Sequence, residues 1–232
     1  MNAINGSATT RDRYTRVAMV LHWAIAALIL FNLVIGFVME DLPLPLRGLV
    51  LMLHASSGLT VLALTVARVA WRLLNTPPPY PSGMKPWERH AAHFAHFLLY
   101  AAMVLMPFSG WAILSAHAPP GSPGAVVEWS APPPGAPVIP GRPAGPPPPL
   151  KIWNVVKLPL IAPVEKIAQE PGGLAPQRVL HDEFVAWHSV GAFLLIAVLL
   201  LHVLGALKHQ FIDGQPEFAR MGIGRAKPSR KE

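Results

Sequence analysis

The 232-residue sequence contains no cysteine. This absence excludes disulfide bonds, iron–sulfur clusters held by thiolates and cofactors attached covalently through sulfur, because each of these needs a cysteine side chain. Any metal chemistry must therefore use histidine, carboxylate or methionine ligands. The ten histidines of the chain make histidine the first candidate.

Charged residues are also scarce, at 13% of the chain, whereas soluble domains carry about 25%. A helix needs about 20 apolar residues to cross the hydrocarbon core of a bilayer. Four stretches are long and apolar enough and lack Asp, Glu, Lys and Arg: Val17–Met39, Gly48–Ala67, Ala91–Ala116 and Phe184–Leu207. The sequence therefore predicts an integral membrane protein with four crossings, in contact with lipid.

The net charge of +7 is distributed as a membrane topology signal. Cytoplasmic segments are enriched in Lys and Arg, and the basic residues gather at both termini and around the connection between the second and third stretches. We therefore predict that both termini are cytoplasmic, and we expect no nucleic-acid partner. These basic residues are Arg11, Arg13, Arg16, Arg68, Arg72, Lys85, Arg89, Lys208, Arg220, Arg225, Lys227, Arg230 and Lys231.

The predicted architecture is an all-α four-helix bundle with up-down topology. Residues 1–16 form a cytoplasmic tail, residues 17–213 the transmembrane domain, and residues 214–232 a basic cytoplasmic tail. A long outer loop, residues 117–180, separates the third and fourth helices, and its first half, His117–Pro149, contains thirteen prolines. Proline at that density excludes helix and central strand. We interpret Leu150–Val164 as a segment that lies on the membrane surface or caps the bundle.

Four histidines are predicted to lie inside the membrane, where polar side chains are functional candidates by default. His22 and His202 lie about five residues from the inner ends of the first and fourth helices, and His54 and His188 lie at a shared depth in the outer leaflet. His188 and His202 are fourteen residues apart, which places them on one helix face about 21 Å from each other. The sequence therefore predicts two pairs, one in each leaflet.

Two imidazoles from opposing helices suit the two axial positions of a haem, whereas a structural zinc site needs four clustered ligands. We predict two haems b, an inner one held by His22 and His202 and an outer one held by His54 and His188. Gly58, Gly191 and Gly205 are expected to leave room for a flat ring. The alternative is four unrelated core histidines that bond to backbone or hydroxyl groups.

The third helix complicates the inner site, because His90, His93 and His96 recur every three residues. His96 reaches the depth of His22 and His202, so it is an alternative inner ligand. We favour His22 as the ligand and interpret His96 as a residue of the haem pocket or of a proton path.

Five motifs resemble the bacterial cytochrome b561 family over roughly Arg13–Asp213, the Pro-rich loop excepted. The resemblance implies that the family's ligands are His22, His54, His188 and His202. It also implies a four-helix, two-haem cytochrome b of the bacterial inner membrane that exchanges electrons with quinone, and superoxide oxidation at the outer face coupled to ubiquinone reduction. The motifs are Leu21-His22-Trp23, His54-Ala-Ser-Ser-Gly58, Ala67-Arg68-Val-Ala-Trp71-Arg72, Pro107-Phe-Ser-Gly110-Trp111 and His202-Val-Leu-Gly-Ala-Leu-Lys208-His209-Gln-Phe211.

Arg72, Lys208 and His209 are candidates for binding the quinone headgroup and its protons at the inner end, where they equally fit a topology signal. Two other functions stay open. One is an electron-transfer subunit that links quinone to a separate periplasmic redox partner. The other is a haem-free transporter or membrane scaffold that uses histidines for protons or metal.

Overall fold

The structure is a computed structural model that describes residues 13–81, 83–119, 122, 124–125, 150–170 and 172–224. Most of the predicted Pro-rich segment His117–Pro149, the first twelve residues and the last eight lie outside this described part of the chain.

Four long helices dominate the described residues: α1 (Arg16–Val38), α2 (Leu44–Leu74), α3 (Pro86–Ser115) and α6 (Leu174–Phe211). Each is long and apolar enough to cross a membrane. The predicted all-α architecture with four spanning helices is confirmed.

The helices extend beyond the predicted apolar stretches. α2 continues past Ala67 to Leu74, and α6 begins at Leu174 rather than at Phe184. Charge-free length measures the part of a helix that fits the hydrocarbon core, whereas helix geometry continues into the polar interface, where Lys, Arg, Asp and Glu are tolerated. The start of α1 is capped by Thr15, whose hydroxyl accepts a hydrogen bond from the Ala18 amide at 3.2 Å.

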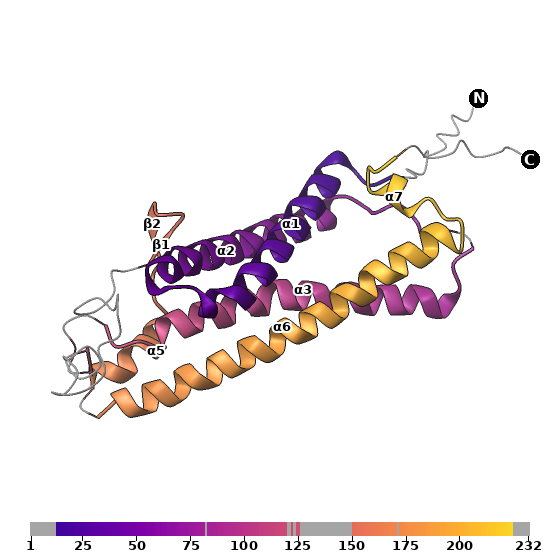
Figure 1. Cartoon of the computed structure of the whole chain (residues 1–232). Helices are drawn as coiled ribbons and strands as arrows, with labels where there is room; N and C mark the ends of the chain where they lie inside the picture. The colour runs from indigo at the N-terminus through magenta and orange to yellow at the C-terminus, as the bar shows by residue number, and fades with distance from the viewer. Residues whose placement is uncertain are drawn as a thin grey trace, which may run out of the picture.

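Neighbouring helices run antiparallel, and the chain passes up and down the bundle in sequence order (Figure 1). The closest backbone packing joins α1 to α2, α2 to α3, and α3 to α6. We call the end of the bundle where α1 begins and α6 ends the inner end, following the predicted topology. A small core from all four helices lies between them: Ile25, Ile29, Val61, Leu99, Met103 and Leu195.

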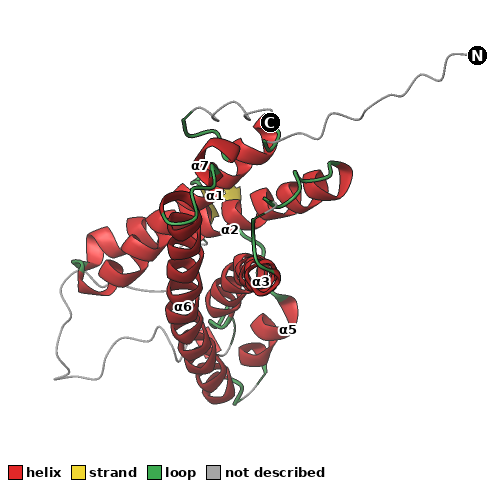
Figure 2. Ribbon diagram, turned by 90° about the vertical axis from the view of Figure 1, so that its right-hand side faces the viewer, coloured by secondary structure: helices red, strands yellow, loops and turns green. Residues whose placement is uncertain are grey.

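Most other large apolar side chains on the long helices are exposed. The long helices splay apart when the bundle is viewed from its end (Figure 2). An apolar exterior around a small core is what a bundle immersed in lipid requires.

The segment after the Pro-rich residues adds small elements at the outer end, on the flanks of α2 and α3. A hairpin of β1 (Lys151–Ile152) and β2 (Val156–Lys157) is held to α2, because the Trp153 amide donates to Ser56 Oγ at 2.8 Å. α5 (Ala162–Glu165) and the 3-10 helix η2 (Lys166–Gln169) follow. The shorter elements η1 (Met39–Asp41) and α7 (Glu217–Arg220) follow α1 and α6.

Candidate functional site

The four predicted histidines form two pairs at two different depths of the bundle, and α6 contributes one histidine to each pair. The ring centroids of His22 and His202 are 6.2 Å apart, and those of His54 and His188 are 6.1 Å apart. The rings within each pair are inclined at 72° and 70°. All four side chains are half-buried. α1 and α2 thus each supply one imidazole that faces α6.

The spacing within each pair fits two ligands on opposite sides of one metal ion. A metal–imidazole nitrogen bond is about 2 Å long, and the ring centroid lies about 1 Å behind that nitrogen, so opposed imidazoles place their centroids about 6 Å apart. Both pairs match this value, and among the described residues each level has one pair of imidazoles at this separation. The donor set therefore fits a haem, whose remaining ligands are its own nitrogens.

In the outer pair, Ser109 orients the His188 ring. The Ser109 hydroxyl donates to the Met106 carbonyl at 2.9 Å and lies 2.8 Å from Nδ1 of His188. Because that hydroxyl proton is already used, the Nδ1–H of His188 donates to the hydroxyl oxygen, and Nε2 keeps a free lone pair. A ligand histidine typically has such a partner on its other nitrogen.

The His54 ring has a polar neighbour that the sequence did not reveal. One end of the Asn32 side-chain amide, on α1, lies 3.2 Å from Nδ1 of His54. The same amide bonds to the hydroxyl of Ser57, which is fully buried. Helix crossing, rather than sequence spacing, brings Asn32 to this position.

Two glycines adjoin the outer pair closely. A Cβ atom on Gly36 would lie 3.1 Å from Cε1 of His54, and one on Gly110 would lie 3.4 Å from Cε1 of His188. The glycines named from the sequence have other surroundings. Gly191 adjoins the sulfur of Met106, Gly58 lies near Asn32, and Gly205 has open space around it.

The inner pair has a charged neighbour. Arg68 on α2 is half-buried, and its Nε donates to the Tyr100 hydroxyl at 3.0 Å. Its positive charge interacts electrostatically with the imidazoles of His22 and His202. A guanidinium at this depth requires an anionic or polar partner; the Tyr100 hydroxyl is one such partner, and a haem propionate would be another.

His96 also reaches the inner pair, from α3. Its ring centroid lies 5.1 Å from that of His202, and its Nδ1 donates to the Ala92 carbonyl at 2.7 Å. The separation is shorter than two ligands on opposite sides of one ion allow. His96 therefore lies beside the His22–His202 pair, on the flank of His202.

Two carboxylates that were not predicted from the sequence contact the inner-end candidates: Asp213 contacts both Lys208 and His209, and Glu88 contacts Lys208. Lys208 Nζ lies 2.6 Å from Glu88 Oε1 and 2.7 Å from Asp213 Oδ2, and His209 Nδ1 lies 2.7 Å from the same Asp213 oxygen. The hydrogen bond from Lys208 holds the pKa of Asp213 below its ordinary value. Arg72 is exposed and does not belong to this cluster.

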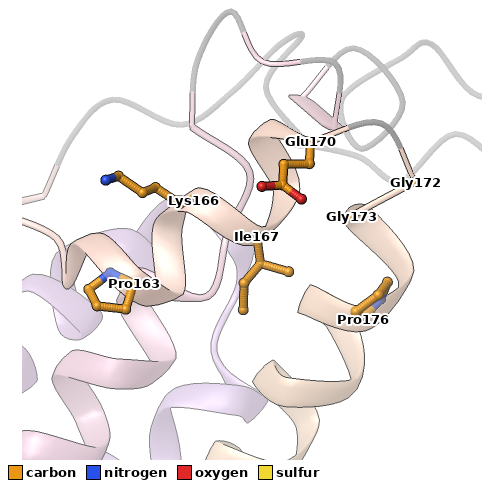
Figure 3. Close-up of a pocket in the computed structure, with 7 residues that line it drawn as sticks. All are labelled: Pro163, Lys166, Ile167, Glu170, Gly172, Gly173 and Pro176. Atoms are coloured by element: carbon orange, nitrogen blue, oxygen red, sulfur yellow. The ribbon is translucent and has the colours of Figure 1, made fainter.

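A surface pocket of about 390 Å³ lies at the outer end, where η2 turns into α6 (Figure 3). It carries one cation and one anion, Lys166 and Glu170, and none of the paired histidines. Its lining residues are Pro163, Lys166, Ile167, Glu170, Gly172, Gly173 and Pro176.

Comparison with known proteins shows the family of the chain. A family model described as prokaryotic cytochrome b561 matches residues 13–224. The chain is 26% identical to cytochrome b561 homolog 2 of Escherichia coli over 215 residues, which cover 91% of this chain and 92% of that protein. It is 37% identical to cytochrome b562 of Cereibacter sphaeroides over 108 residues, which cover 44% of this chain and 66%, just under two thirds, of that relative.

Proposed function

Because the chain belongs to the prokaryotic cytochrome b561 family and is a multi-pass membrane b-type cytochrome of electron transfer, we propose that it holds two haems b. His22 and His202 are the ligands of the inner haem, and His54 and His188 are the ligands of the outer one. The chain lies in the bacterial inner membrane and conducts single electrons between its two faces.

The observation that carries this proposal is the repeated separation of about 6 Å between an imidazole on α6 and an opposed imidazole on α1 or α2. Four unrelated core histidines have no reason to pair twice at the same spacing. Each haem supplies a reversible one-electron store. The protein's part is to orient the imidazoles, through Ser109 at His188, and to place a cation, Arg68, beside the inner haem.

The proposed donor is superoxide and the proposed acceptor is ubiquinone, as the resemblance to the family implies. Two superoxide anions each lose one electron at the outer face and become O₂, and one ubiquinone takes up two electrons and two protons to become ubiquinol. Lys208 and His209 contact Asp213 at the inner end, where this cluster is positioned to exchange those protons. His96 and Arg72 are further candidates around the quinone headgroup.

The test is a set of purified variants compared with the wild type by reduced-minus-oxidised spectra and by superoxide-dependent ubiquinone reduction. His188→Ala and His54→Ala should each lose the outer haem and retain the inner one. Loss of both haems in a folded His188→Ala protein, or no loss at all, would contradict the ligand assignment.

The activity assay separates the alternatives. Steady ubiquinone reduction by the wild type with superoxide supports the proposed reaction. A two-haem protein that reduces quinone only with a separate protein donor is an electron-transfer subunit. A folded protein without haem, produced with ample haem supply, is a transporter or scaffold.

A further inference from the structure

The residues that follow α6 fold back over the inner end of the bundle. We call Gly214–Gly224, which include α7, the inner cap. Ala219 and Arg220 in the cap are only 6% and 8% exposed, so this segment is packed as part of the fold. Figure 1 shows α7 beside the start of α1 and the end of α6.

Hydrogen bonds fasten the inner cap to the beginning of α1. The Tyr14 amide donates to the Arg220 carbonyl at 3.2 Å, and the indole Nε1 of Trp23 donates to the Met221 carbonyl at 2.9 Å. Arg220 also donates to the Pro79 carbonyl at 2.6 Å, in the connection between α2 and α3. The cap therefore ties the end of α6 to two other parts of the inner end.

The backbone of the cap approaches α1 at Gly222. Gly222 has a φ of +88°, and a Cβ atom there would lie 2.9 Å from the sulfur of Met19. A side chain at this position is disfavoured both by the backbone conformation and by the contact. A side chain larger than glycine at this position would require Met19 or the cap to shift.

The cap bonds to Trp23, the residue next to the proposed haem ligand His22. Trp23 follows His22, and the two rings meet edge to face with centroids 5.0 Å apart. In the bundle itself α1 packs most closely on α2, and α6 packs most closely on α3. The cap is a continuation of α6 that bonds directly to α1, so it links the helices that carry His202 and His22.

We infer that the inner cap is a positioning element for the inner haem. Through the Met221–Trp23 hydrogen bond it fixes the orientation of the turn of α1 that carries His22. This inference rests on the proposed two-haem function. A cap that only stabilised the fold would affect both haems alike, whereas a positioning cap affects the inner haem alone.

The decisive variants are Trp23→Phe, which keeps an aromatic ring and removes the hydrogen bond, and Gly222→Val, which displaces the cap. Trp187→Phe is the matched control, because Trp187 also adjoins a proposed ligand, His188, but is 71% exposed. Haem loss to excess apomyoglobin and the redox titration of each haem are measured for all four proteins. Hydrogen exchange at the Arg16–His22 amides is measured on haem-free wild type and Gly222→Val.

Loss of one hydrogen bond changes an equilibrium constant by about fivefold. The Trp23→Phe protein should therefore lose the inner haem about fivefold faster than the wild type. Its inner haem should shift in midpoint potential, and its outer haem should not. Gly222→Val should do more, and its amides should exchange faster without haem. Trp187→Phe should match the wild type. An unchanged inner haem in both cap variants, or equal changes in both haems, would overturn the inference. A wild type without two haems would instead overturn the proposed function, and exchange in the haem-free protein would still test the link between the cap and α1.

Discussion

The two histidine pairs on α6 have nearly the same spacing but different neighbours. At the outer pair the neighbours are neutral: the Ser109 hydroxyl, the Asn32 amide, and the backbone at Gly36 and Gly110. At the inner pair they include the guanidinium of Arg68. One helix thus contributes to two similar histidine pairs in two electrostatic environments, and under the proposed function these environments, rather than the ligands, distinguish the two haems.

This difference in charge predicts a direction of electron transfer for the proposed two-haem protein. A fixed positive charge stabilises the reduced, less positive state of a nearby iron, so we expect Arg68 to raise the potential of the proposed inner haem relative to the proposed outer one. The expected direction of electron transfer is then from the outer level to the inner level.

The largest expected effect distinguishes the two candidates for the inner ligand. His22→Ala should abolish binding of the inner haem, because one axial position loses its nitrogen, while His96→Ala should keep two haems per chain. Pyridine haemochrome analysis of both proteins measures the haem content. If His22→Ala retained two haems and His96→Ala lost one, His96 rather than His22 would be the inner ligand.

Removal of the hydroxyl that orients His188 should weaken the outer site selectively. Loss of the partner on a ligand histidine typically costs about 10–100-fold in metal affinity, so Ser109→Ala should lose the outer haem faster in a competition assay with apomyoglobin. Ser115→Ala, at the outer end of the same helix, is the control. Equal haem retention in Ser109→Ala and the wild type would show that the hydroxyl does not act through His188.

Neutralisation of Arg68 should reduce the difference in midpoint potential between the two proposed haems. At an effective dielectric constant of about 20, the charge contributes about 1–2 kcal/mol to a neighbouring redox centre, or roughly 50–100 mV. Arg68→Gln should lower the midpoint potential of the inner haem by this amount and leave the outer one in place. A redox titration that shows no change, or a rise, would contradict the proposed direction of electron flow.

The smallest expected effect concerns the carboxylate at the inner end. The pKa of Asp213 is lowered in the folded protein, chiefly by the hydrogen bond from Lys208, so its contribution to stability is complete above the unfolded value, about 4, and is lost as the pH falls through the lower folded pKa. Asp213→Asn should melt below the wild type near neutral pH, and the difference in Tm should shrink in acid. A difference independent of pH would assign the effect to packing.

The sequence contains most of the information on the long helices and on the face of α6. Two residues fourteen positions apart on a helix point in directions within about 40° of each other, so His188 and His202 share a face of α6. The absence of charged residues marked the stretches that span the membrane. These two signals predicted the fold and the pairs of histidines that the structure brings together.

The remainder depends on helix crossings and on local polar contacts, which have no periodic signature. Asn32 and Gly36 reach His54 only because α1 crosses α2 at that level. Glu88 and Asp213 lie far apart in sequence, and Lys208 brings them together. The β1–β2 hairpin depends on Trp153 and Asn154, which adopt positive φ values without a glycine to mark the turn.

The central claim, two haems held by four histidines, is tested most directly by the haem content of the purified wild-type protein. Pyridine haemochrome absorbance divided by the protein concentration from quantitative amino-acid analysis gives the number of haems per chain. The structure predicts two haems b per chain, both low-spin as expected for paired imidazoles. One haem per chain in protein made with ample haem supply would contradict the two-level arrangement, and none would contradict the ligand assignment as a whole.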